Sequence, residues 1–145
     1  MASPDTDWIL NLFMSVDMFS ALSITEMTDV IKHLSRYQFK KGKTIVKQGA
    51  PGDSFFIVCK GKVKVLLKKG LLKTVQVREL GPGQFFGEMS LLLDQPRSAT
   101  VVAAEDTDCF VLFKTDFQNL VRKNPAFANI LKSTSEKRSF ELRQK

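Results

Sequence analysis

The spacing of apolar residues divides the chain into three parts, and the first part has a helical pattern. Four apolar residues follow the i, i+3, i+4, i+7 spacing of one helix face: Met27, Val30, Ile31 and Leu34. Ser23 precedes this stripe and Glu26 follows three residues later, which is the capping-box pattern of a helix start. A short amphipathic segment over residues 7–14 comes before it. The pattern therefore predicts helices within residues 1–36.

From residue 37 to residue 113 the apolar spacing becomes that of β-strands. Lysines and valines alternate over residues 62–65, and the segment TVQVREL (residues 74–80) alternates in the same way. Glycine-containing segments separate these short runs: KKGK, KQGAPGD, CKGKV, KKG and LGPGQ. Short strands about ten residues apart with glycine turns are typical of an all-β sandwich or barrel.

The last part of the chain, residues 114–145, returns to helical spacing. Thr115 and Gln118 form a second candidate capping box, and Asn124-Pro125 marks a break or a restart. Two apolar stripes follow the helical period: Phe117, Leu120 and Val121, then Phe127, Ile130 and Leu131. Phe140 lies nine residues beyond Leu131 and about half a turn off that stripe, so we expect it to be exposed unless something covers it.

Composition indicates one folded domain. The chain has 145 residues, of which 43% are apolar, so it can bury one core but has no room for two ordinary domains. Its apolar runs are far shorter than the roughly 20 residues that span a bilayer. The start, MASPDTDWIL, lacks the basic region of a secretory signal, and Cys59 and Cys109 lack C-x-x-C spacing. We expect a soluble cytoplasmic protein with reduced thiols.

The net charge of +7 is concentrated in the middle of the chain. Residues 1–31 carry five acids and no base, residues 32–78 carry thirteen bases and one acid, Asp53, and residues 79–145 carry nine of each. So basic a segment attracts anions: a nucleotide, nucleic acid, a phospholipid surface or an acidic partner. A solvated lysine-rich strand face is the alternative, and charge alone does not choose among these.

Motifs for catalysis are missing from the sequence. It contains no G-x-S-x-G, H-E-x-x-H, C-x-x-C or Walker pattern. His33 is the only histidine, which removes most acid–base and metal-binding constellations. We therefore expect a protein that is not an enzyme and that holds no metal.

Glu88 and Arg97 stand in a mainly apolar and small-residue run, FFGEMSLLLDQPRSATV (residues 85–101). Such charges need partners, because burying an unpaired charge costs several kcal/mol. Gly87 lets the backbone approach an anion closely, Arg97 offers a guanidinium fork for phosphate oxygens, and carboxylates accept from sugar hydroxyls. Either the two side chains pair with each other, or a ligand with a phosphate and an adjacent ribose hydroxyl lies between them.

This run closely resembles the phosphate-binding cassette of the cyclic nucleotide-binding domain family, found in catabolite-activator-type regulators, cyclic-nucleotide-dependent kinases and cyclic-nucleotide-gated channels. FGEMSLLLDQPRSATV follows the family pattern F-G-E-x-[AS]-L-L, a spacer and P-R-[AST]-A-[TS]-V at nearly every position. The resemblance continues through VDMFSALSITEMTDVIKHL, GAPGDSFFIVCKGKVKV, GPGQFFGE and FQNLVRKNP. It implies a single, mainly β domain with flanking helices over residues 1–145: an N-terminal helical bundle (1–36), a β jelly roll (37–113), and C-terminal hinge and lid helices (114–145).

By this resemblance, Arg97 is expected to hold the cyclic phosphate and Glu88 the ribose 2′-OH of cyclic AMP or cyclic GMP. Val65 is expected to help wall the base. The other binding residues are expected in the cassette, residues 86–99: Phe86, Gly87, Met89, Ser90, Ser98 and Ala99. The residue that caps the base is left open among three candidates: Arg138, Phe140 and Leu142.

The implied function is that of a regulatory sensor, standing alone or as part of a larger protein. Ligand binding is expected to repack an apolar hinge around Phe117 and Leu120, so that the final helix closes over the base and signals to an unidentified effector protein. Ser98 permits cyclic GMP without excluding cyclic AMP, with a slight lean to cyclic AMP. Two alternatives stay open: a ligand-free interaction scaffold of the same fold, and a nucleic-acid-binding protein with a basic surface, although no recognition-helix motif is present.

Overall fold

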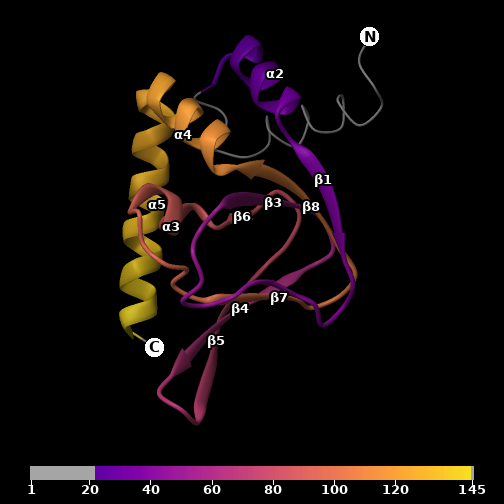
Figure 1. Ribbon diagram of the computed structural model, residues 1–145, viewed down its shortest axis with the longest axis vertical. Coiled ribbons are helices and arrows are strands. Elements are labelled where there is room, and N and C mark those ends of the chain that lie inside the picture. Colours follow the sequence, from indigo (N-terminus) through magenta and orange to yellow (C-terminus); the bar gives the residue numbers. More distant parts are fainter. Residues whose placement is uncertain (1–21, 145) are drawn as a thin grey trace.

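The strands form two four-stranded antiparallel sheets with helices along one side (Figure 1). A computed structural model describes residues 22–144. The first sheet has the order β1-β8-β3-β6, with β1 (Ser35–Phe39), β3 (Ser54–Lys60), β6 (Phe85–Phe86) and β8 (Thr107–Phe113). The second has the order β2-β7-β4-β5, with β2 (Thr44–Val46), β4 (Val63–Lys69), β5 (Lys73–Leu80) and β7 (Thr100–Ala103). This is the β jelly roll with flanking helices that was predicted.

The described helices lie before, within and after the sheets: α2 (Ile24–Lys32), α3 (Glu88–Leu92), α4 (Lys114–Lys123) and α5 (Pro125–Gln144). The predicted capping box of α2 is confirmed, because Ser23 Oγ accepts from Glu26 N at 3.1 Å and Glu26 Oε1 accepts from Ser23 N at 2.9 Å. The predicted restart is also present, since α5 begins at Pro125. The amphipathic segment over residues 7–14 lies outside the described residues.

The second predicted capping box is wrong. Helix α4 begins at Lys114, so Thr115 lies inside the helix, and the capping residue Phe113 makes no side-chain cap. Strand β8 runs directly into the helix, and Lys114 N donates to Asp53 O at 2.9 Å. The N–H of the first helical residue is thus satisfied by a tertiary hydrogen bond instead of by a local cap.

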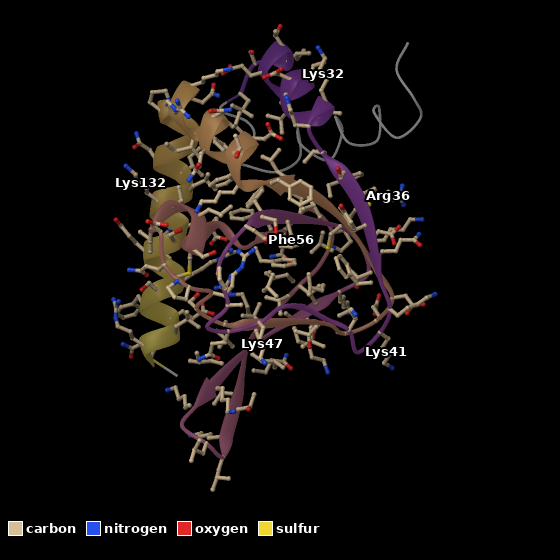
Figure 2. All side chains as sticks on the ribbon, in the orientation of Figure 1. Lys32, Arg36, Lys41, Lys47, Phe56 and Lys132 are labelled. Carbon is tan, nitrogen blue, oxygen red and sulfur yellow. The ribbon has the colours of Figure 1, made fainter. Side chains whose placement is uncertain are left out.

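The core consists of two clusters on opposite faces of the first sheet. Strand β3 contributes to both, because alternate side chains point to opposite faces. Phe55 and Ile57 pack with α4 and α5, while Phe56 and Val58 pack between the two sheets, where Figure 2 labels Phe56. Burial on both faces explains why β3 reads as a continuous apolar run.

The thiol of Cys109 gives a test of this core. Both cysteines are buried thiols, and burial, with smaller contributions from Cys59 and Asp108, raises the pKa of Cys109 to about 12. The folded chain therefore keeps this proton above about pH 8.5, where the unfolded thiol loses it. We expect the free energy of unfolding to fall by about 1–2 kcal/mol between about pH 8 and pH 10 from this group alone. Urea unfolding of the wild type and of Cys109→Val between these pH values measures this loss. If the free energy of unfolding fell equally with pH in both proteins, the raised pKa of Cys109 would be contradicted.

Candidate functional site

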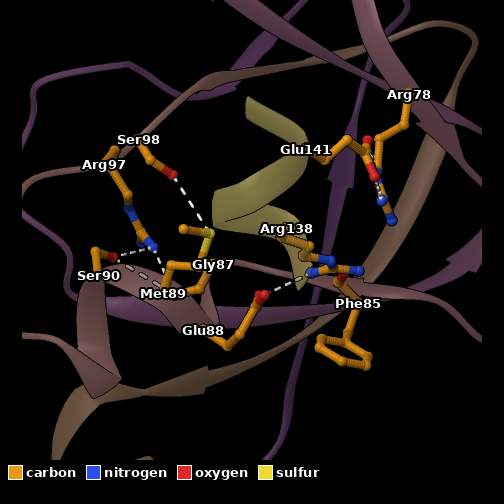
Figure 3. Close-up of polar contacts among 10 residues, drawn as sticks. All are labelled: Arg78, Phe85, Gly87, Glu88, Met89, Ser90, Arg97, Ser98, Arg138 and Glu141. Carbon is orange, nitrogen blue, oxygen red and sulfur yellow. Dashed lines mark hydrogen bonds and ion pairs between the residues drawn. The ribbon is translucent and has the colours of Figure 1, made fainter. Parts of the chain in front are cut away.

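A pocket lies between the second sheet, α3 and the end of α5 (Figure 3). Its wall includes all nine residues that the sequence analysis selected: Val65, Phe86, Gly87, Glu88, Met89, Ser90, Arg97, Ser98 and Ala99. It also includes two of the three candidate cap residues, Arg138 and Leu142, and five residues that the sequence analysis did not select: Val77, Arg78, Leu80, Val101 and Glu141. The structure thus brings the whole candidate set together around one cavity.

Two glycines let backbone segments close around Arg97. Gly87 caps α3 with a φ of +93°, in the left-handed region, and a Cβ there would lie 2.9 Å from Ser54 O and 3.0 Å from Arg97 Nη1. A Cβ at Gly52 would overlap the hydroxyl of Ser90. Both positions therefore require the absence of a side chain.

Arg97 is a buried cation that binds neutral oxygens. The residue is 5% exposed, and Nη1 donates to Gly87 O at 3.0 Å and to Ser90 Oγ at 2.9 Å, while Nη2 donates to Ser54 O at 2.8 Å. The nearest carboxylate is that of Asp53, 3.6 Å from Nη2, and its side chain is 84% exposed. Burial lowers the pKa of Arg97, and the charges of Asp53 and Glu88 partly offset this. A positive charge held in this way favours an anion in the pocket.

Glu88 pairs with Arg138 rather than with Arg97. Arg138 Nη1 donates to Glu88 Oε1 at 2.7 Å, and Glu88 is 1% exposed. Arg138 Nη2 donates to Phe85 O at 2.9 Å, and the guanidinium lies over the Phe85 ring at 4.6 Å. Among residues 22–144, the buried Nε of Arg138 finds no hydrogen-bond partner. Of the two alternatives drawn from the sequence, direct pairing of Glu88 and Arg97 is therefore wrong.

A second ion pair holds α5 against the sheet. Arg78 Nε donates to Glu141 Oε1 at 3.1 Å, and Arg78 Nη2 contacts Glu141 Oε2. Of the three candidate cap residues, Arg138 and Leu142 line the pocket, whereas Phe140 is 57% exposed, as the half-turn offset from Leu131 predicted. Helix α5 is thus already in contact with the pocket.

Three side chains of α5 line this pocket: Arg138, Glu141 and Leu142. About 60 Å³ of space remains, whereas pockets for small organic ligands measure about 300–1,000 Å³. The remaining space is therefore smaller than the usual volume of a pocket for a ligand of this kind.

Within residues 22–144, no group of three or more histidine, cysteine, aspartate or glutamate side chains is placed to hold a metal ion. In the same range, no helix combines the length and apolar character that a bilayer crossing requires.

Comparison with known proteins identifies the family. The family model described as "cyclic nucleotide-binding domain" matches residues 36–124, which include α3, Glu88 and Arg97. The chain belongs to this family. Its fold and the position of its pocket agree with that membership, since the cassette that carries the resemblance forms one wall of the cavity.

Three similar proteins illustrate the relationship. The chain is 36% identical over 134 residues to a cyclic nucleotide-gated potassium channel of Mesorhizobium japonicum, covering 91% of this chain and 36% of the channel. It is 37% identical over 116 residues to the cyclic AMP receptor protein of Thermus thermophilus, covering 79% of this chain and 53% of that protein. The solved structure of the Thermus thermophilus catabolite activator protein is 34% identical, with a TM-score of 0.77, covering 88% of this chain and 60% of that one. The chain thus spans between about a third and about half of the curated relatives.

Proposed function

We propose that this domain binds a cyclic nucleotide in the pocket, with the cyclic phosphate at Arg97 and the ribose 2′-OH at Glu88. One observation carries the proposal: a buried guanidinium whose hydrogen bonds go to neutral oxygens shares the pocket with a buried carboxylate. A phosphodiester anion beside a hydroxyl donor complements these two groups.

The charges of the pocket favour a ligand with a single negative charge. Of the three arginines in the described wall, Arg78 is paired with Glu141 and Arg138 with Glu88, which leaves Arg97 as the cation without a hydrogen-bonded carboxylate. A cyclic phosphate carries one charge. A triphosphate would leave most of its charge uncompensated in this site.

We further propose cyclic AMP as the preferred ligand. The similarity to a cyclic AMP receptor protein supports this choice. A hydrogen bond from Ser98 Oγ to Met89 Sδ, at 3.6 Å, also supports it, because it engages the hydroxyl that would otherwise meet a guanine base. Met89, Val65 and Leu142 give the base an apolar environment. Ser98 remains the residue through which cyclic GMP would be accepted.

Regulation follows from the position of Arg138. Because Arg138 donates to Glu88 Oε1 and lines the space that the ribose would enter, we propose that the nucleotide releases Arg138 from Glu88 and shifts α5. A ligand moves such an equilibrium only by its differential affinity for the two states. The displaced α5 is then the element that an effector protein senses.

Replacing Arg138 tests this exchange. Arg138→Gln removes the competitor for Glu88, so we expect cyclic AMP to bind about tenfold more tightly. It also leaves Glu88 buried without its partner, so the empty protein loses about 3 kcal/mol of stability. Arg143→Gln is the matched control for charge, because it removes from α5 an exposed charge that donates to Ser139 Oγ and does not line the pocket in the described part of the chain. Equal or weaker binding by Arg138→Gln than by this control would contradict the exchange.

Calorimetric titration with cyclic AMP, cyclic GMP and 5′-AMP tests the proposed function. We expect saturable micromolar or tighter binding of cyclic AMP, weaker binding of cyclic GMP, and no comparable binding of the open 5′-monophosphate. Absence of heat from both cyclic nucleotides, in protein shown by mass spectrometry to be free of ligand, would overturn the proposal.

A further inference from the structure

The β4–β5 hairpin extends beyond the body of the domain. Strand β4 pairs with β7 only as far as Leu66, but it pairs with β5 as far as Lys69. The outer part of the hairpin is therefore two-stranded, and in Figure 1 it projects away from both sheets. In Figure 2 its side chains point into open space around the tip.

The tip of this hairpin consists of two exposed leucines. Leu71 is 90% exposed and Leu72 is 100% exposed, the highest values among the large apolar residues described. Neither belongs to a core cluster of the described residues. Adjacent leucines at the end of a projection contribute nothing to the fold, which indicates a surface that covers them.

Lysines surround the two leucines. Lys68 and Lys69 precede the tip and Lys73 follows it directly. From residue 60 to residue 78 the chain carries seven bases and no acid: Lys60, Lys62, Lys64, Lys68, Lys69, Lys73 and Arg78. Apolar residues at the tip suit the acyl-chain boundary of a bilayer, and the flanking cations suit its anionic headgroups.

The hairpin is held in place by a side chain from outside it. Lys68 N donates to Gln48 Oε1 at 2.8 Å, and Gln48 Nε2 donates to Lys68 O at 3.2 Å. These two hydrogen bonds satisfy the backbone of β4 at Lys68, beyond the end of its pairing with β7. The leucines therefore lie at the tip of a preformed hairpin, which lowers the conformational-entropy cost of docking.

We propose that the hairpin tip docks on an anionic phospholipid surface, with Leu71 and Leu72 entering the interface and Lys68, Lys69 and Lys73 facing lipid phosphates. A nucleic acid would use the lysines but gives two leucines nothing to bury against. A second copy of the chain would bring the same positive charge to the tip, and lysine is depleted at protein–protein interfaces. The proposal is independent of ligand binding in the pocket.

Vesicle co-sedimentation of the full chain tests the docking. We expect binding to phosphatidylcholine vesicles that contain about 30% phosphatidylglycerol and little binding to phosphatidylcholine alone. Both Leu71→Ser/Leu72→Ser and Lys68→Gln/Lys69→Gln/Lys73→Gln should weaken it at least about tenfold. The matched controls are Ile24→Ser, at an apolar residue 67% exposed on α2, and Lys123→Gln/Lys132→Gln/Lys137→Gln on α4 and α5. Full binding by the leucine variant, or no binding by the wild type, overturns the proposal.

A spectroscopic measurement locates the contact. In Leu72→Trp, the tryptophan emission should shift to the blue on addition of the anionic vesicles, relative to the wild type with its single Trp8. Ile24→Trp should show no such shift. An unchanged Leu72→Trp spectrum under conditions where the protein sediments with vesicles would show that another surface binds, and a leucine-dependent binding to duplex DNA would show that the partner is not a lipid.

Discussion

Replacing Arg97 with alanine is expected to weaken cyclic AMP binding by about 2–5 kcal/mol, which is at least about thirtyfold in Kd. The reason is that Arg97 is the buried cation of the pocket without a hydrogen-bonded carboxylate among the described residues. Loss of this charge leaves the cyclic phosphate desolvated without a counter-ion. Calorimetric titration of the variant and the wild type measures the difference.

Arg97→Lys separates charge from geometry. Lysine keeps the positive charge, but one ammonium cannot reproduce the fork that reaches Ser54 O, Gly87 O and Ser90 Oγ together. We expect its affinity to fall between those of the alanine variant and the wild type. Circular dichroism melting checks that each variant is folded. Wild-type affinity in folded Arg97→Ala would show that the phosphate lies elsewhere.

The second large effect is expected from Phe117→Ala, which should lower the free energy of unfolding by about 3–5 kcal/mol. Phe117 is 1% exposed on α4, and its ring lies 5.1 Å from that of Phe55 on β3. The deletion leaves a cavity where α4 packs on the first sheet. Urea unfolding gives the value.

Phe140→Ala is the matched control for this substitution. Phe140 is 57% exposed on α5, so the same chemical change there should alter stability by no more than about 0.5 kcal/mol. A loss below about 1 kcal/mol in Phe117→Ala would contradict the role of Phe117 in joining α4 to the sheet. In the regulation proposed above, this packing would link α4 to the site, because Phe55 follows Ser54, the residue whose carbonyl accepts from Arg97.

Local patterns in the sequence predicted most of the fold and one wall of the site. Ser23 and Glu26 marked a helix start because both halves of a capping box lie within one turn. The cassette was predicted by its resemblance to the family pattern, because Gly87, Glu88 and Arg97 lie within one short stretch; their spacing alone left direct pairing of Glu88 and Arg97 open.

The other wall of the site could not be predicted in this way. Arg138 meets Glu88 across 50 residues, and Arg78 meets Glu141 across 63. These pairs depend on how α5 lies on the sheet, and the spacing of apolar residues along the sequence does not predict that arrangement. The capping prediction for Thr115 was wrong for a related reason: the helix starts one residue earlier, at Lys114, whose N–H donates to the distant Asp53 O.

The most direct test of the central claim is the crystal structure of the chain grown with cyclic AMP. We expect the cyclic phosphate within hydrogen-bond distance of the Arg97 guanidinium, the ribose 2′-OH on Glu88, and Arg138 released from that carboxylate. A nucleotide bound outside this pocket, or bound while Arg138 still donates to Glu88, would contradict the account.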